Sequence, residues 1–277
     1  GDANGSYEFD GTNDDIIIGD TGFPMGNSAR TVAGWVKLDT DATGDNTLLF
    51  YGQKVDGKGF WLGIDVMGDL EASGYGDANA SMDFDANATV DDGAWHHVAF
   101  TSDGNTMYFT RNNFSNGVKR TDKNGTVRLK IFKSVKKGGS WGAPVELPFN
   151  DNSYSVSHPA LSPDNKQLYF ASDMPGTVGF SDIWVVDIIG DNEYSEPKNL
   201  GPIINTEGRE NFPFISKKGN LYFSSDGRPG LGGLDIYVVA TKKNGDVAYV
   251  INLGEPVNSP QDDFAFIVDD YLNIGYF

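Results

Sequence analysis

Residues 162–173 read SPDNKQLYFASD, and three other segments repeat this pattern. They are SDGNTMYFTR at 102–111, SKKGNLYFSSD at 216–226 and DDYLNIGYF at 269–277. Successive repeats lie 61, 53 and 54 residues apart, measured between the Tyr-Phe pairs that end at Phe109, Phe170, Phe223 and Phe277. Because a repeated supersecondary unit cannot bury its apolar face alone, the pattern predicts that these units stack on one another.

Each unit carries the same series of short apolar runs. HPALS or FPFIS leads through a polar turn into LYF, and a β-branched run such as DIWVVDI follows. Short runs bounded by Gly, Pro, Asn and Asp are typical of strands, and no long helical periodicity competes with them. The period is somewhat above the ~40 to 50 residues usual for propeller blades. We therefore expect four antiparallel strands per unit, with the Tyr-Phe pairs, Trp184 and Tyr237 in the core or between blades.

The sequence of residues 100–277 resembles that of a known family. NLGPIINTEGRENFPFIS and NLYFSSDGRPGLGGLDIY are similar to the WD-like propeller of Bacteroidota outer-membrane proteins of the outer-membrane protein A family. In that family the propeller lies in the periplasm, and related members belong to the gliding and type 9 secretion machinery. The resemblance implies a location in the cell envelope: the periplasm, the outer membrane or the cell surface. It also implies other envelope proteins, and glycan or peptidoglycan, as partners.

The first hundred residues differ from the remainder in charge and in sequence motifs. They contain 18 acidic against 4 basic residues, whereas the remainder contains 21 against 17. YEFDGTNDDIIIG, TVAGWVKLDTD, GFWLGID and DGAWHHVAF resemble, in order, the laminin-G-like, concanavalin A-like jelly roll. The alternation of Val32, Gly34 and Val36 with Ala33 and Trp35 supports a strand. A charge step of this size favours two units of separate origin.

The predicted fold is therefore all-β, a partial jelly-roll β-sandwich followed by β-propeller blades of four antiparallel strands. We place the jelly-roll segment at residues 1–100 and the propeller repeats at 101–277. Both units are predicted to be incomplete. The jelly-roll motifs end after WHHVAF, and four copies of the repeat are few for a propeller, which typically has ~4 to 8 blades. We expect the sequence to be a fragment, or a join of pieces, of a longer protein.

Composition excludes several classes of function. The absence of cysteine excludes disulfides, thiolate metal sites and cysteine nucleophiles. A net charge of −18 argues against a nucleic-acid partner, since neutralising phosphates needs clustered Lys and Arg. No apolar run approaches the ~20 residues that cross a bilayer.

One basic segment breaks the acidic pattern between residues 119 and 137. It holds eight basic residues against Asp122 alone: Lys119, Arg120, Lys123, Arg128, Lys130, Lys133, Lys136 and Lys137. One interpretation is a solvated hairpin of the first repeat unit. The other is a docking patch for an acidic partner or an anionic envelope polymer.

Catalysis has little support in the sequence. Only His96, His97 and His158 are available as imidazole bases, and we expect structural roles for all three. No G-x-S-x-G elbow occurs. We therefore predict that the protein is not an enzyme, with no catalytic and no cofactor-binding residues.

Calcium is the metal that the sequence favours. Ca²⁺ prefers clustered oxygen ligands from loops, and the resemblance to jelly rolls with a structural calcium near the first strand selects Asp10 and Asp14. Ordinary turn carboxylates are the alternative. The loop from Asp39 carries Phe50 where an EF-hand has its Glu, so it is not an EF-hand.

Two classes of function remain open. The first is a non-catalytic scaffold of the cell envelope, in which the propeller binds proteins and the jelly roll is an adhesive or carbohydrate-binding module. Tyr51 and Tyr75, beside glycines, are candidates for an exposed sugar-binding face, whereas Trp35, Trp61 and Trp95 read as sandwich core. The second is a carbohydrate-active hydrolase that uses a propeller or jelly-roll cleft.

Overall fold

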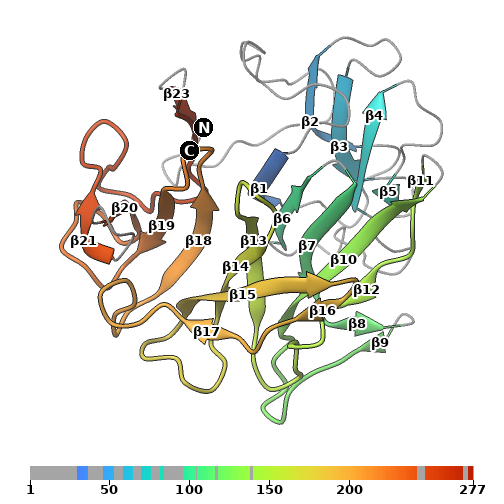
Figure 1. Ribbon diagram of the computed structural model, residues 1–277, viewed down its shortest axis with the longest axis horizontal. Coiled ribbons are helices and arrows are strands. Elements are labelled where there is room, and N and C mark those ends of the chain that lie inside the picture. The colour runs from blue at the N-terminus through green and yellow to red at the C-terminus, as the bar shows by residue number, and fades with distance from the viewer. Residues whose placement is uncertain are drawn as a thin grey trace.

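A computed structural model describes eleven ranges of the chain. These are residues 30–36, 46–52, 59–64, 70–75, 82–83, 96–103, 105–115, 118–137, 140–241, 247–270 and 274–276. Within them the secondary structure consists of strands and no helix, so the predicted all-β fold is confirmed. No helix of this part is long and apolar enough to cross a membrane. Figure 1 shows the strands in order along the chain.

The N-terminal part forms two antiparallel sheets. The first has the order β2 (Asn46–Gly52), β3 (Gly59–Ile64), β4 (Leu70–Tyr75), β5 (Met82–Asp83). The second has the order β1 (Arg30–Val36), β6 (His96–Ser102), β7 (Thr106–Asn112), β10 (Leu129–Lys137), β11 (Ser140–Trp141), and β12 (Val145–Glu146) also pairs with β10. A short hairpin joins β8 (Phe114–Ser115) to β9 (Val118–Lys119). Two facing sheets of this kind suit the jelly-roll part of the predicted fold.

The second sheet includes strands from both predicted units. β1 pairs with β6, and β6 pairs with β7 through Phe100 and Phe109. The predicted boundary after residue 100 therefore falls inside β6. The division into domains at that residue stays a prediction.

Two antiparallel sheets follow, and we call them blade I and blade II. Blade I is a five-stranded sheet with the order β13 (Val156–Leu161), β14 (Gln167–Ser172), β15 (Asp182–Gly190), β16 (Glu193–Tyr194), and β17 (Lys198–Asn199) also pairs with β15. Blade II consists of β18 (Glu210–Ile215), β19 (Leu221–Ser225), β20 (Asp235–Thr241) and β21 (Val247–Asn252). All pairs are antiparallel, as predicted. Blade II has the predicted four strands, whereas blade I has a fifth because β16 and β17 both pair with β15.

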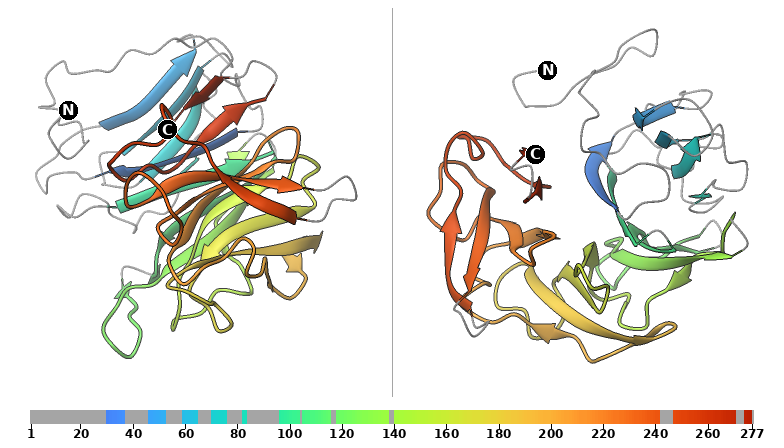
Figure 2. Two further views of the ribbon diagram at one scale, coloured as in Figure 1. Left: turned by 90° about the vertical axis from the view of Figure 1, so that its left-hand side faces the viewer. Right: turned by 45° about the horizontal axis from the view of Figure 1, so that its top comes forward.

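A last pair of strands repeats the start of a blade. β22 (Ile267–Asp269) pairs with β23 (Ile274–Tyr276). The first strands β13 and β18 lie next to each other, and the sheets follow one another along an arc in Figure 2 (right). This is the blade-against-blade order that the repeat predicts.

Apolar side chains of the second and third strands form the core. Phe170 and Phe223, from equivalent places in β14 and β19, are fully buried, and so is Tyr108 in β7. Trp184 and Tyr237 on the third strands are also buried. These residues were predicted to be core, and the structure confirms it. Phe277, the last of the repeated aromatics, lies outside the described residues.

The first strands β13 and β18 each contain a bulge with an unusual backbone conformation, and the same conformation occurs just before β22. His158, Phe212 and Ala265 have φ angles of 56°, 52° and 58°, and register shifts occur at the first two. The rings of His158 and Phe212 stack with centroids 4.2 Å apart, and Phe264 stacks on Phe212 at 5.1 Å. A positive φ at a bulky residue is costly, so the stack and the bulge hold each other in place.

Candidate functional site

Four segments pack together at one end of the blades, and we call them the loop belt. They are the loops at residues 173–181 and 226–234, and the connections at 200–209 and 253–263. Two buried aspartates anchor the loops: Asp182 accepts hydrogen bonds from the backbone N–H groups of Val178 and Gly179, at 2.8 and 3.3 Å. Asp235 does the same for Leu231 and Gly232, at 2.7 and 3.3 Å. The two anchors are 53 residues apart and make equivalent bonds.

Buried asparagines fix the connections to the third strands. The Asn205 side chain accepts from the Ile183 N–H at 2.8 Å and donates to the Ile183 carbonyl at 3.1 Å. Asn258 makes the same two bonds to Ile236, at 2.8 and 3.0 Å. Each amide replaces a backbone partner for the third strand, so the connection cannot shift without breaking two bonds.

Two more carboxylates accept hydrogen bonds from the segments that lead into the next sheet. Glu210, fully buried, accepts from the Thr206 N–H at 2.7 Å and from the Thr206 and Ser225 hydroxyls at 2.6 Å. Asp263 accepts from the N–H and hydroxyl of Ser259, at 2.6 and 3.1 Å. The hydrogen bonds of these two acids therefore stabilise the connections between the sheets.

Close backbone contacts complete the loop belt. A Cβ atom at Gly179 would collide with the carbonyl oxygens of Gly208 and Thr206. In the next repeat, a Cβ atom at Gly232 would collide with those of Gln261 and Ser259. Glycine is required at both positions because the loop and the connection touch through their main chains.

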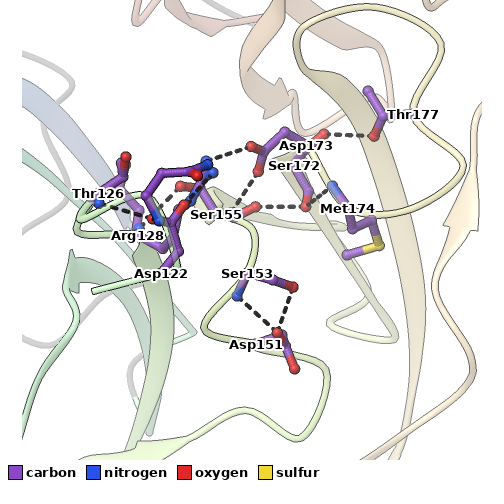
Figure 3. A network of polar contacts seen from close by, with 12 residues as sticks. Asp122, Thr126, Arg128, Asp151, Ser153, Ser155, Ser172, Asp173, Met174 and Thr177 are labelled. Carbon is purple, nitrogen blue, oxygen red and sulfur yellow. Dashed lines mark hydrogen bonds and ion pairs between the residues drawn. The ribbon is translucent and has the colours of Figure 1, made fainter. Parts of the chain in front are cut away.

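A charged network ties the hairpin before β10 to blade I (Figure 3). The Arg128 guanidinium donates to Asp122 Oδ2 at 2.7 and 2.9 Å and to Asp173 Oδ2 at 2.8 Å. The other oxygen of Asp173 accepts from the Ser155 N–H at 2.6 Å. Arg128 thus links two segments that are distant in the sequence.

Three carboxyls of the described part have shifted pKa values, and all three are shifted downward. Hydrogen bonds from the Thr126 and Asn124 N–H groups and from Arg128 lower the pKa of Asp122. Bonds from Ser153 lower the pKa of Asp151, and bonds from Ser162 and Lys166 lower that of Asp164. A general acid needs a raised pKa, so these three carboxyls are suited to holding turns.

Part of the basic segment forms ion pairs inside the molecule. Lys130 and Lys133 on β10 are buried, and their ammonium groups contact Glu146 and Asp191. The interpretation of this segment as a solvated hairpin is therefore wrong for these two lysines. They are buried because acidic partners elsewhere in the chain pair with them. Arg120 and Lys123 are exposed, and a docking role for them stays a prediction.

The three histidines lie in two places. His158 is buried at the bulge of β13, where its N–H donates to Thr110 Oγ1 at 3.0 Å and its Nδ1 faces the Phe212 N–H at 3.5 Å. His96 and His97 lie on β6, opposite Val36 and Trp35 of β1. The structural role predicted for His158 agrees with these contacts.

The predicted calcium ligands cannot be placed. Asp10 and Asp14 lie outside the described residues, and the described part contains no group of three His, Asp or Glu side chains arranged to hold a metal. Tyr51 lies on β2 and Tyr75 lies on β4, where only the backbone is described. In the strand register, Tyr75 lies opposite Gly59 of β3. The calcium site and the sugar-binding face stay predictions.

The loop belt carries side chains that the sequence did not single out. Val178, Phe180, Ile203 and Leu231 are large apolar residues that are 48–69% exposed. The Arg209 guanidinium lies over the Phe180 ring at 5.1 Å and bonds to Asp226 at 2.8 Å. Aligning the two repeats at a spacing of 53 would have shown Val178 and Leu231 at one position. Their exposure has no signal in the sequence.

Comparison with protein families identifies the first half of the chain. A family model described as the concanavalin A-like lectin/glucanases superfamily matches residues 10–150, about half of the 277 residues. The chain belongs to the concanavalin A-like lectin/glucanases superfamily. The resemblance of the first hundred residues to a concanavalin A-like jelly roll is confirmed, whereas the resemblance to the Bacteroidota family stays a prediction. In this superfamily member the matched region runs from before β1 to beyond β12 and crosses the predicted boundary.

Solved structures give weaker similarities to this superfamily member. Puromycin hydrolase matches with a TM-score of 0.44 and 14% identity, over 78% of this chain and 30% of that protein, so the chain spans less than a third of it. An α-L-arabinofuranosidase from Lactobacillus brevis matches with 0.43 and 11%, over 73% and 70%. A putative TolB from Agrobacterium tumefaciens matches with 0.32 and 17%, over 86% and 95%. Comparison with curated protein sequences finds no match.

Proposed function

We propose that this protein is a non-catalytic interaction scaffold of the cell envelope. Its blades act as a rigid protein-binding platform, and its jelly roll acts as an adhesive or carbohydrate-binding module. The observation that carries the proposal is the contrast within the loop belt. Its buried carboxylates, Asp182, Glu210, Asp235 and Asp263, are all engaged by backbone or hydroxyl donors, while its large apolar side chains point outward.

This contrast favours binding over chemistry for a physical reason. A hydrolase needs a carboxyl pair in which one member is kept protonated. The acids of the loop belt instead accept several N–H or O–H donors each from the chain itself, so their oxygens are occupied by contacts that hold the loops. Exposed apolar side chains on a rigid surface are the usual sign of an interaction site.

The family and the sequence resemblance supply the rest of the proposal. A superfamily described by both lectins and glucanases leaves sugar binding and sugar cleavage as possible roles of the jelly roll. We favour sugar binding, with glycan or peptidoglycan as ligand and other envelope proteins as partners of the blades. A periplasmic, outer-membrane or cell-surface location follows from the resemblance to the propellers of outer-membrane proteins.

A binding screen with a turnover assay tests the proposal. The purified chain is applied to glycan and peptidoglycan arrays, and every retained ligand is incubated with the chain and examined for cleavage by mass spectrometry. We expect retention without cleavage. Cleavage of a retained glycan would overturn the proposal in favour of a carbohydrate-active hydrolase, and the same would hold for any retained muropeptide.

A further inference from the structure

The loop belt presents an apolar side chain at the same point of each blade. Val178 and Leu231 are 53 residues apart, and they are 54% and 48% exposed. Each is held by its own N–H, which donates to the buried carboxylate of Asp182 or Asp235. Ile203, from the connection between the blades, is also 48% exposed. The repeat thus places a row of apolar side chains on one surface.

Phe180 extends this row and is fixed in position. Its ring is 69% exposed, yet its N–H donates to the Gly208 carbonyl at 2.8 Å. Ser181 next to it forms a bridge with Arg209, whose guanidinium lies over the ring. A side chain already held in place loses little conformational entropy when a partner covers it.

Arg228 places a positive charge beside the row. One of its terminal nitrogens donates to the carbonyls of Ile203 and Ile204, at 2.6 and 2.9 Å. Its Nε atom is buried and has no acceptor among the described residues. Whereas Arg209 is paired with Asp226, the described part offers Arg228 no carboxylate within 4.0 Å. The guanidinium is thus oriented by carbonyls and retains its charge for an outside anion.

Backbone contacts connect the segment of Phe180 with that of Arg228. The backbone of Gly208, which binds Phe180, lies against Gly227, the residue before Arg228. Glu207 is the exposed acid of this connection. Its side chain is in water, where the field of an exposed carboxylate is weak, so it does not neutralise the partly buried Arg228.

We infer that Val178, Phe180, Ile203, Leu231 and Arg228 form a docking surface for an extended segment of another protein that carries apolar side chains next to a carboxylate. The inference rests on the proposed scaffold function and names the chemistry of the partner. Aromatic and arginine side chains dominate the binding energy of protein interfaces, and a guanidinium matches a carboxylate with two parallel bonds. A second copy of this chain is a poor occupant, because two chains of net charge −18 repel each other.

A peptide-binding experiment tests the inference. Three fluorescent peptides of equal length are titrated with the chain and followed by anisotropy. The first carries Leu and Phe next to Asp and Glu, the second has Lys in place of the acids, and the third has Ser in place of the apolar residues. We expect only the first peptide to bind. Phe180→Ser and Arg228→Gln should each weaken its affinity about tenfold.

Matched variants separate the docking surface from other exposed groups. Tyr249→Ser removes an aromatic ring that is 60% exposed on β21, and Lys166→Gln removes an exposed positive charge from the turn before β14; neither should change the affinity. Thermal unfolding checks that each variant is folded. Arg228→Lys keeps the charge without the paired donors, and an intermediate loss of affinity is expected if Arg228→Gln proves unstable.

Several results would overturn the inference. It fails if the Lys peptide binds as well as the acidic one, or if Phe180→Ser and Arg228→Gln leave binding unchanged. Concentration-dependent self-association that Phe180→Ser abolishes would give the surface to a second copy and would also overturn it. If peptide binding depends on Tyr249 instead, this surface fails while the scaffold function stands. If no peptide binds and the glycan and peptidoglycan arrays retain nothing, both fail.

Discussion

The side-chain amide of Asn205 forms two hydrogen bonds with the backbone of Ile183. It accepts a hydrogen bond from the Ile183 N–H at 2.8 Å and donates one to the Ile183 carbonyl at 3.1 Å. Asn258 repeats this arrangement on Ile236. Both asparagines are about 98–99% buried. One side chain in each repeat therefore attaches the connection between blades to the third strand of the preceding blade.

Asn205→Ala should destabilise the protein strongly. The substitution leaves a buried N–H and a buried carbonyl of Ile183 without their partner, which costs roughly 2–4 kcal/mol. Asn258→Ala should cost a similar amount because its contacts are the same. Urea unfolding gives the free energy of unfolding for each variant. Gln261→Ala, at an exposed amide of the same loop belt, should change it by less than about 0.5 kcal/mol; equal losses at Asn205 and Gln261 would contradict the structure.

Gly179→Ala should disrupt the contact between loop and connection. The added Cβ meets backbone carbonyl oxygens of Thr206 and Gly208 that cannot rotate away. Overpacking of this kind costs about 1–3 kcal/mol. Gly190→Ala is the matched control, because its Cβ would lie 3.5 Å from the flexible Glu193 carboxylate. A melting temperature that falls equally for both variants would show that the loop belt is not packed as described.

The sequence predicted the regular parts of the fold because their signals are local. The alternation around Trp35 predicted β1, and the repeated Tyr-Phe pairs predicted the second strands with the buried rings of Phe170 and Phe223. Turn residues between the runs then set where each strand ends. Repeat spacing added that the units stack, which is a consequence of burying one face of each sheet.

What the sequence did not predict depends on partners far along the chain. Lys130 and Lys133 read as part of a charged surface, yet Glu146 and Asp191 allow them to be buried. The left-handed backbone of His158 follows from its bulge and from the ring of Phe212, which lies 54 residues later in the chain. Contacts of this range leave no periodic trace. The exposure of Phe180 has the same origin, since Gly208 and Arg209 hold it there.

Asp122→Asn should destabilise the protein in a pH-dependent way. The folded-state pKa of Asp122 is lowered by the Thr126 N–H first, with Asn124 and Arg128 adding to it. Its stabilising effect is therefore present above the unfolded pKa of about 3.9 and is lost as the pH falls through the folded value. The variant should melt a few degrees below the parent at pH 7, and the gap should close below pH ~4.

A melting series from pH 2 to 8 checks this difference. Glu207→Gln is the control, since its exposed carboxyl has no partner among the described residues and the variant should track the parent at every pH. Arg128→Lys should reproduce part of the loss at neutral pH, because an ammonium cannot bond to Asp122 and Asp173 in the same geometry. A gap for Asp122→Asn that widens in acid would contradict the assignment.

The buried Tyr108 and the half-buried Tyr194 form a phenol pair whose oxygens are 3.3 Å apart, with the rings edge to face. Burial raises the pKa of both phenols, most strongly at Tyr194. A raised folded-state pKa gives stability that is complete below the unfolded value of about 10 and is lost as the pH rises above it. Both phenols should therefore remain protonated while the protein is folded and ionise only as it unfolds in alkali. In an absorbance titration at 295 nm, Tyr194→Phe should remove amplitude from this late phase and leave the phase that precedes unfolding unchanged. Loss of amplitude from the early phase instead would show that the pair is open to solvent.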